Sequence, residues 1–175
     1  GSTVAFVGPS GSGKSTVIDM ILGFLQPQSG SITLDEQPLA DVSDAWRQRL
    51  GYVPQDVSIF DGSIAQNVAL SWTDEHDETR VREALQQASL LATIDARPQG
   101  IYGQVGERGL ALSGGQRQRL GIARALYPSP LVLVMDEATS ALDVRTEAEV
   151  NDAIAALRGK TTLILVAHRL STIMH

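Results

Sequence analysis

The chain has 175 residues, 43% of them hydrophobic, which suits a single domain with a buried core. Its 14 Lys and Arg against 20 Asp and Glu give a formal net charge of −6. This acidic balance argues against non-specific nucleic-acid binding, which depends on clustered basic residues, and the lack of cysteine excludes disulfides and thiol chemistry.

The pattern of apolar residues predicts strands that alternate with helices. Strands are expected at residues 3–7, 31–34, 51–53, 131–135 and 161–166. Helices are expected at about 14–22, 43–49, 74–91, 113–127 and 143–157, and residues 97–109 are expected to form an irregular connector. The first and the last two strands are expected to be buried, as in a parallel sheet covered on both faces. The fold class predicted is therefore α/β with a mostly parallel sheet.

A glycine-rich loop joins the first strand to the first helix. It fits the phosphate-loop pattern G-x-x-x-x-G-K-[ST] in the required strand-loop-helix context. Its residues are Gly8, Pro9, Ser10, Gly11, Ser12, Gly13, Lys14, Ser15 and Thr16. The glycines allow successive N–H groups to turn inward, and the positive end of the helix faces the same point. We expect Lys14 to meet the outer phosphates of a nucleotide and Ser15 to ligate Mg²⁺. The alternative is a chance turn before a helix.

Two adjacent carboxylates, Asp136 and Glu137, follow the apolar strand at 131–135. Ligands of open α/β sheets sit at the carboxyl ends of the strands, so these acids should emerge beside the phosphate loop. Asp136 is the expected Mg²⁺-side acid, and Glu137 is the expected general base for an attacking water. The alternative is a pair of exposed acids at a strand end. No span of apolar residues approaches the ~20 that cross a bilayer, so we expect no membrane crossing within the chain.

A second helix start has the composition of an anion site, because a serine and two glycines precede its first turn. The stretch Leu112, Ser113, Gly114, Gly115 and Gln116 matches in full the signature of ATP-binding cassette (ABC) ATPases. The chain resembles that family along essentially all of its length. The resemblance implies that two such domains pair head to tail, with each ATP held between one phosphate loop and the other subunit's signature. A simple helix cap is the alternative.

The resemblance assigns roles to three further residues. Gln55 resembles the Q-loop glutamine, which contacts Mg²⁺ or water and links the site to the transmembrane partner, although a surface loop explains it equally well. Asp143 resembles the D-loop acid that couples the two sites, and it can also cap the next helix. His168 resembles the switch histidine, which bonds the γ-phosphate and orients the water held by Glu137. The implied catalytic set is thus Glu137, His168, Gln55 and Lys14, and the implied metal set is Ser15, Gln55 and Asp136.

Three stretches, 59–68, 105–109 and 167–172, resemble the corresponding sequences of exporter-type ABC domains. The first would meet the coupling helices of the membrane domain, although its apolar residues also suit core packing. The resemblance implies a partial ABC domain, with a RecA-like core at about 1–55 and 128–175 and a helical subdomain at about 56–127. The family's antiparallel N-terminal strands, its adenine-stacking aromatic and its C-terminal end would lie outside the chain.

The function implied is ATP binding and hydrolysis with Mg²⁺, powering export by a transmembrane domain at the cytoplasmic face of a membrane. The expected partners are that domain and a second nucleotide-binding domain, identical or not, with no nucleic acid. One alternative is a soluble ABC-type clamp on nucleic acid or ribosomes, which the acidic balance and the lack of a coiled-coil insertion disfavour. Another is a regulatory module without turnover, which the presence of Glu137 and His168 disfavours.

Overall fold

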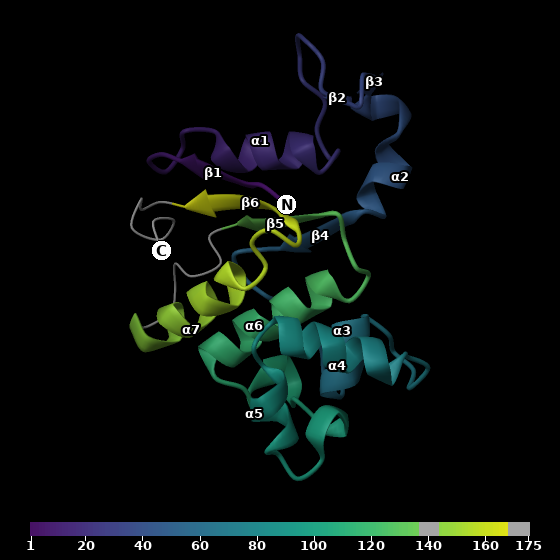
Figure 1. Ribbon diagram of the computed structural model, residues 1–175, viewed down its shortest axis with the longest axis vertical. Coiled ribbons are helices and arrows are strands. Elements are labelled where there is room, and N and C mark those ends of the chain that lie inside the picture. The colour runs from purple at the N-terminus through teal and green to yellow at the C-terminus, as the bar shows by residue number, and fades with distance from the viewer. Residues whose placement is uncertain (137–143, 168–175) are drawn as a thin grey trace.

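A four-stranded parallel sheet forms the centre of the molecule (Figure 1). The computed structural model describes residues 1–136 and 144–167. The strand order is β1-β6-β5-β4, which confirms the predicted α/β class with a mostly parallel sheet. The strands are β1 (Thr3–Val7), β4 (Leu50–Val53), β5 (Val132–Asp136) and β6 (Thr162–Ala167).

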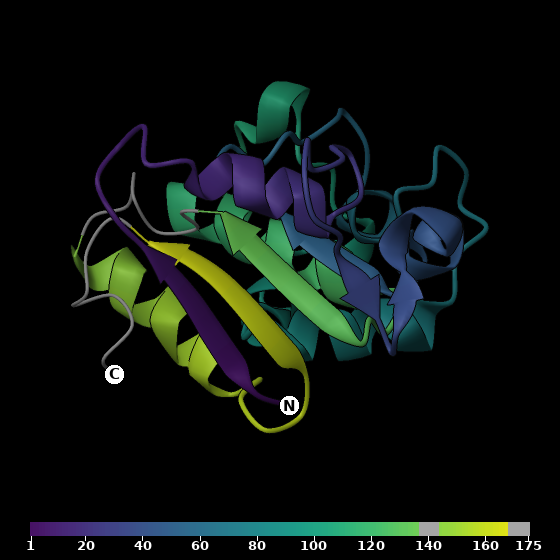
Figure 2. The same ribbon diagram turned by 90° about the horizontal axis from the view of Figure 1, so that it is seen from above.

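Helices cover the two faces of the sheet, as the view from above shows (Figure 2). On one face α1 (Lys14–Ile21) packs through Ile18 against Val134 and Val166. On the other face Leu133 and Leu163 join a larger core with α6 (Gly114–Leu126) and α7 (Val144–Ala155). Successive side chains of a strand point to opposite faces, so β5 and β6 contribute to both cores. This explains why these two strands are apolar without alternation.

Strand β1 differs from its prediction as a buried strand. Among the described residues it pairs with β6 alone, so it lies at the edge of the sheet. Val4 is 48% exposed and Val7 is 41% exposed. A short apolar run has the same pattern at the edge of a sheet as in its middle, so the sequence could not separate the two.

Three short helices, α3 (Ile64–Ala69), α4 (Glu78–Gln87) and α5 (Leu91–Asp95), lie beyond α6 on the side away from the sheet (Figure 1). The prediction of a single helix at 74–91 is wrong at both ends, since α4 begins at Glu78 and ends at Gln87. Asp77 caps α4 by accepting a hydrogen bond from the Arg80 N–H at 3.1 Å, and Ser89, with φ of 53°, ends the helix before α5. Helix α3 was not predicted, because its six residues are too few to show a helical period.

The chain between α1 and β4 forms a small outlying part. Strands β2 (Thr33–Leu34) and β3 (Gln37–Pro38) pair antiparallel around a turn in which Asp35 and Glu36 both have positive φ. Helix α2 (Ser43–Arg47) follows and ends two residues earlier than predicted. The remaining helical turns are 3₁₀ turns at Leu39–Asp41, Gly100–Tyr102 and Glu107–Gly109, and the last two interrupt the connector predicted as irregular.

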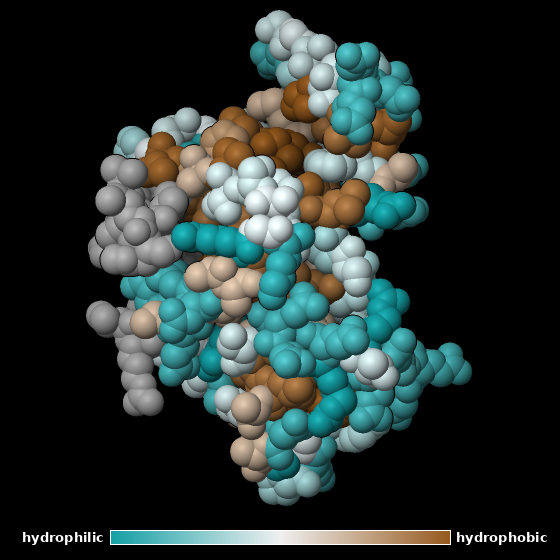
Figure 3. Space-filling view, viewed as in Figure 1, coloured by the Kyte–Doolittle hydropathy of each residue, from teal (hydrophilic) through white to brown (hydrophobic). Residues whose placement is uncertain are grey.

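A hollow of about 220 Å³ lies between this outlying part and the C-terminal end of α1. Met20, Leu25 and Leu39 contribute apolar side chains to it, and hydrophobic surface gathers around it in Figure 3. It is at the opposite end of α1 from the phosphate loop, so it is not the predicted nucleotide site. Within residues 1–136 and 144–167, no helix is both long enough and apolar enough to cross a membrane.

Candidate functional site

The phosphate loop has the backbone geometry that its glycines allow. Gly11 and Gly13 have φ of 78° and 87°, in the left-handed region that favours glycine. A Cβ on Gly8 would lie 2.8 Å from the Ser12 Oγ, so the loop closes tightly on itself at that point. Helix α1 begins at Lys14 as predicted, and Gly13, its cap residue, makes no side-chain bond to the first turn. The positive end of α1 is thus left for another acceptor.

Lys14 lies over the loop that precedes it. Its Nζ donates to the carbonyl oxygen of Gly8 at 2.8 Å and to that of Pro9 at 2.9 Å. The ammonium therefore adds a full positive charge beside the N–H groups of the loop and of the first helical turn. Ser15 and Thr16 follow on that turn and are exposed. An anion with several oxygens fits these donors, because it can accept from backbone N–H groups and from the ammonium together.

Asp136 is the last residue of β5 and lies at the same edge of the sheet as the loop. In the register, Asp136 stands opposite Val166 of β6, while Val7, directly before the loop, stands opposite Ala167. The strands are parallel, so their carboxyl ends meet at this edge. Burial, and then the nearby carboxylates of Asp136 and Asp19, raise the pKa of the Tyr52 phenol. This edge of the sheet consequently carries negative charge close to the positive loop.

The donors at this site, a carboxylate and a hydroxyl, fit a Mg²⁺ ion that is also bound by substrate phosphates better than they fit a metal ion bound by protein side chains alone. Mg²⁺ is usually held by one or two carboxylates together with substrate phosphates. In the described ranges, 1–136 and 144–167, no three His, Asp or Glu side chains gather into a metal-binding group. Asp136 and the Ser15 hydroxyl could therefore contribute to a Mg²⁺ ion that phosphate oxygens largely coordinate.

Gln55 follows the end of β4 by two residues and is exposed, so it also lies at the carboxyl edge of the sheet. The other three predicted residues, Glu137, Asp143 and His168, lie outside the described residues. The structure tests neither their positions nor their roles.

The signature stretch begins α6, as predicted. Ser113 is the cap residue: its Oγ accepts from the Gln116 N–H at 3.3 Å, and its own N–H donates to Gln116 Oε1 at 3.0 Å. Ser113 and Gly114 are exposed, whereas Gly115 is buried against Thr146 of α7, whose methyl group a Cβ at position 115 would overlap. The expected helix cap is thus present, and Gly115 allows α6 to approach α7 closely.

The two predicted anion sites lie on different faces of the sheet. Helix α1 packs on one face, and α6 packs on the other with α7 (Figures 1 and 2). The chain brings Lys14, Ser15, Asp136 and Gln55 to one edge. Helices α1 and α6, which begin at the loop and after Ser113, pack on opposite faces of the sheet, so the two helix starts belong to different layers of the molecule.

Residues 1–140 match the ABC transporter family. The chain belongs to that family. It is 50% identical over 177 residues to the ATP-dependent lipid A-core flippase of Ralstonia nicotianae. The aligned region covers 99% of this chain and 30% of the flippase. It is 42% identical to the multidrug resistance ABC transporter ATP-binding and permease protein of Lactococcus lactis, covering 99% of this chain and 30% of that protein.

A solved structure agrees with these relatives. The chain superposes on a bacterial Atm1-family ABC exporter with ATP bound, with a TM-score of 0.84, 44% identity, and coverage of 98% of this chain and 30% of the exporter. The chain spans less than a third of the length of these relatives. The expected membership of the ABC transporter family is confirmed, and the relatives named here are a flippase, a multidrug transporter and an exporter.

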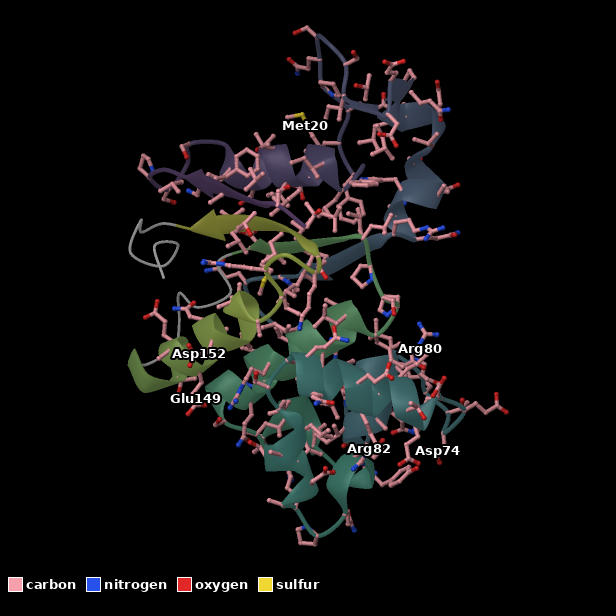
Figure 4. The ribbon with its side chains drawn as sticks, in the orientation of Figure 1. Met20, Asp74, Arg80, Arg82, Glu149 and Asp152 are labelled. Atoms are coloured by element: carbon pink, nitrogen blue, oxygen red, sulfur yellow. The ribbon has the colours of Figure 1, made fainter. Side chains whose placement is uncertain are left out.

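Sequence reasoning missed three polar residues that organise this ABC domain. Arg119 of α6 is 8% exposed and donates to the Ser89 carbonyl oxygen and to Glu149 of α7, each at 2.9 Å (Figure 4). Arg124 of α6 and the fully buried Asn67 of α3 form a second network. On an amphipathic helix, arginines that form buried hydrogen bonds have the same spacing in the sequence as arginines on a solvent-exposed face, so the sequence does not distinguish them. Asn67 stands between apolar residues at 64, 65 and 68, and a buried amide there needs hydrogen-bond partners.

Proposed function

We propose that this domain binds ATP and Mg²⁺ in a head-to-tail pair with a second nucleotide-binding domain, and that closure and hydrolysis drive export by a transmembrane domain. The observation that carries the proposal is the presence of two anion-type helix starts on opposite faces of one sheet. A second copy, or a related domain, could bring its signature to the phosphate loop of the first. Each ATP would then lie between the two.

The proposed roles follow the chemistry of each side chain. Lys14 and backbone N–H groups within residues 8–16, apart from Pro9, which has none, bind the phosphates. Ser15, Gln55 and Asp136 hold Mg²⁺ directly or through water. Mg²⁺, when bound, neutralises charge that develops on the phosphate oxygens. Residues 113–116 of the opposite domain meet the γ-phosphate through the N–H groups that the cap between Ser113 and Gln116 does not use, those of Gly114 and Gly115. Asp143 couples the two sites.

In the hydrolytic step, the oxygen of a water forms a bond to the γ-phosphorus while the bond from that phosphorus to the β,γ-bridging oxygen breaks. The bridging oxygen leaves with the electron pair as part of ADP. Glu137 accepts the proton that the attacking water loses. His168 donates a hydrogen bond to the γ-phosphate and holds the water in line with the bond that breaks.

The surface proposed to meet the transmembrane domain combines two segments that are far apart in the sequence. The Ile64 N–H donates to the Gly103 carbonyl oxygen at 3.1 Å, and the Val105 N–H donates to that of Gly62 at 3.0 Å. These bonds join the two stretches, 59–68 and 105–109, that resemble exporters. Exposed apolar side chains lie in or next to them, including Tyr102, Leu110 and Trp72, and the Trp72 ring lies 4.4 Å from that of Phe60. Such a patch suits a protein partner.

The names of the relatives support export over a soluble clamp, because the ones identified are a flippase, a multidrug ABC transporter and an exporter structure. We accordingly place the domain at the cytoplasmic face of a membrane, through the transmembrane domain of the full-length protein.

Replacing Glu137 by Gln in the full-length protein tests the proposed chemistry. An amide cannot accept the proton, so hydrolysis should fall by about 100-fold or more while ATP binding persists and closed dimers accumulate. Glu83→Gln, the same change on the exposed face of α4, is the matched control and should leave hydrolysis unchanged. Normal turnover by Glu137→Gln would refute the role as general base.

A further inference from the structure

The segment that follows Gln55 packs on α6 through Val57. Helix α6 has glycine at position 121, where a Cβ would lie 2.6 Å from a methyl carbon of Val57. Gly121 thus leaves the space that Val57 occupies. Because the contact is tight, the position of Val57 along α6 is closely determined.

Arg124, one turn further along α6, binds the backbone of the same segment. Its Nη1 donates to the Ser58 carbonyl oxygen at 2.7 Å. Its Nε donates to the Asn67 carbonyl oxygen at 2.8 Å, and its Nη2 donates to Asn67 Oδ1 at 3.0 Å. Burial lowers the pKa of Arg124 from its ordinary value, yet a guanidinium keeps its charge in proteins. One side chain therefore fixes residue 58 and α3 to α6 by charge-assisted hydrogen bonds.

Asn67 completes the network from the centre of α3 and has no exposed surface. Its Nδ2 donates to the carbonyl oxygens of Phe60 and Ser63, both at 3.0 Å. Its Oδ1 accepts from the Phe60 N–H at 3.2 Å in addition to the guanidinium of Arg124. Residues 57–67 and α6 are in this way joined by buried hydrogen bonds, which are costly to break singly because each leaves a polar group without a partner.

Gln55 lies in the short span between this assembly and the sheet. Val53 ends β4 and is paired with Met135 of β5, and Val57 is already packed on α6. Only residues 54–56 connect the two, and a chain extends by no more than about 3.6 Å per residue. A displacement of α6 relative to the sheet is therefore taken up within residues 54–56, a span that contains Gln55 and has bends at 55 and 56.

We propose that Arg124 is a positioning residue for Gln55. Its guanidinium binds the segment after Gln55 to α6, so that this segment and α6 move together. The position of α6, which has Ser113 at its other end, then determines where the Gln55 amide lies at the carboxyl edge of the sheet. This inference rests on the proposed role of Gln55 at Mg²⁺. The indirect role predicts a specific dependence: loss of Arg124 should matter only while Gln55 is present.

A double-mutant cycle in the full-length protein separates this role from simple stabilisation. The variants are Gln55→Ala, Arg124→Lys and the pair together, and the first measurement is equilibrium binding of a fluorescent ATP analogue as free Mg²⁺ is varied, without turnover. Partners behind a metal ligand affect metal affinity by about tenfold or more, so each single variant should shift the Mg²⁺ midpoint by roughly that factor. The pair should match Gln55→Ala alone.

Hydrogen exchange provides a second readout that does not depend on nucleotide. In Arg124→Lys the amide of Phe60, which donates to Asn67 Oδ1, should exchange faster without nucleotide, since the Asn67 network has lost Nη2. Val57→Ala loosens the same segment without removing a charge and should shift the Mg²⁺ midpoint in the same direction. Arg82→Lys, on α4 in a half-exposed ion pair with Asp95 of α5, is the control and should change neither measurement (Figure 4).

The outcomes distinguish the inference from the proposal beneath it. If Gln55→Ala leaves the Mg²⁺ dependence unchanged, the proposed role of Gln55 is wrong, and the inference falls with it. If Gln55→Ala shifts the midpoint but the effect of Arg124→Lys simply adds to it, Gln55 keeps its role and the inference is overturned. The inference is also overturned if Val57→Ala leaves the midpoint unchanged although the Phe60 amide exchanges faster.

Discussion

Helices α1 and α6 both begin at glycine-containing turns, and they differ in how their first N–H groups are satisfied. At α1 the cap residue is Gly13, which offers no side-chain acceptor, and Lys14 adds a cation at the same end. At α6 Ser113 and Gln116 cap the helix reciprocally. The first helix start has no side-chain acceptor for its N–H groups, which are left to a ligand or to water, whereas the cap at the second start satisfies two N–H groups within the chain. This difference suits a loop that binds phosphate within its own chain and a signature that acts on a neighbour's phosphate.

Helix α3 begins with the same reciprocal cap as α6, an arrangement called a capping box, so the box alone does not identify a ligand site. Ser63 and Gln66 form the same reciprocal pair as Ser113 and Gln116. Ser63, however, is 3% exposed, so no ligand can reach that helix start. The box is therefore a general way to begin a helix. What distinguishes α6 is that Ser113 and Gly114 are exposed.

The largest expected effect comes from removing the cation at α1. Lys14→Ala should weaken ATP binding by about 100-fold, because it removes a charged donor from the phosphate loop. The chain has one other lysine, Lys160, which is exposed near the start of β6 at the opposite edge of the sheet. Lys160→Ala removes the same charge and should bind ATP normally in the same equilibrium assay. Equal binding by both variants would show that α1 does not form the site.

A smaller effect is expected where α6 meets α7. Gly115→Ala places a methyl group against the Thr146 methyl, and such overpacking costs about 2 kcal/mol of folding stability. Thr146→Ser removes that methyl and should recover most of the loss in the double variant. The measurement is the thermal unfolding midpoint of the domain within the full-length protein. Failure of Thr146→Ser to restore it would mean that Gly115 serves something other than this close approach.

The sequence predicted the parts of the site that depend on local chemistry. The loop glycines, Lys14 and the cap at Ser113 each follow from residue types within a few positions, and the structure confirms the helix starts at 14 and 113. The edge position of β1, the turn at Ser89 and the helix at 64–69 depend on long-range packing, which a local pattern does not contain. The networks of Arg119 and Arg124 were missed for the same reason, since their acceptors lie 30 to 66 residues away.

The two capping boxes should differ in how much stability they supply. Ser113→Ala should cost about 1 kcal/mol, the usual loss for a serine cap. Ser63→Ala should cost more, since Ser63 is buried and water cannot replace its bond to the Gln66 N–H. Thermal unfolding of the two variants under one condition gives the comparison. An equal loss at both positions would contradict the distinction between an exposed and a buried helix start.

The smallest expected effect concerns charge at the carboxyl edge of the sheet. The pKa of Tyr52 is raised by burial and by Asp136 and Asp19, so above about pH 10 the unfolded chain releases this proton first. Stability from this group is complete below that pH and declines as the pH rises toward the higher folded pKa. Tyr52→Phe should remove part of the alkaline loss, measured by urea unfolding between about pH 9 and 11. An unchanged slope would mean that no such charge surrounds the phenol.

The central claim, that the phosphate loop of one domain works with the signature of another, can be tested by mixing two defective copies in a homodimeric full-length protein. One copy carries Lys14→Ala and the other Gly114→Asp, whose carboxylate suits the helix N-terminus but repels phosphate. Dimers of either variant alone should retain no tightly bound ATP. In the mixed dimer both defects fall in one site, so we predict one ATP retained per dimer. Retention of no ATP by the mixed dimer would place the loop and signature of each site in the same chain and contradict the account.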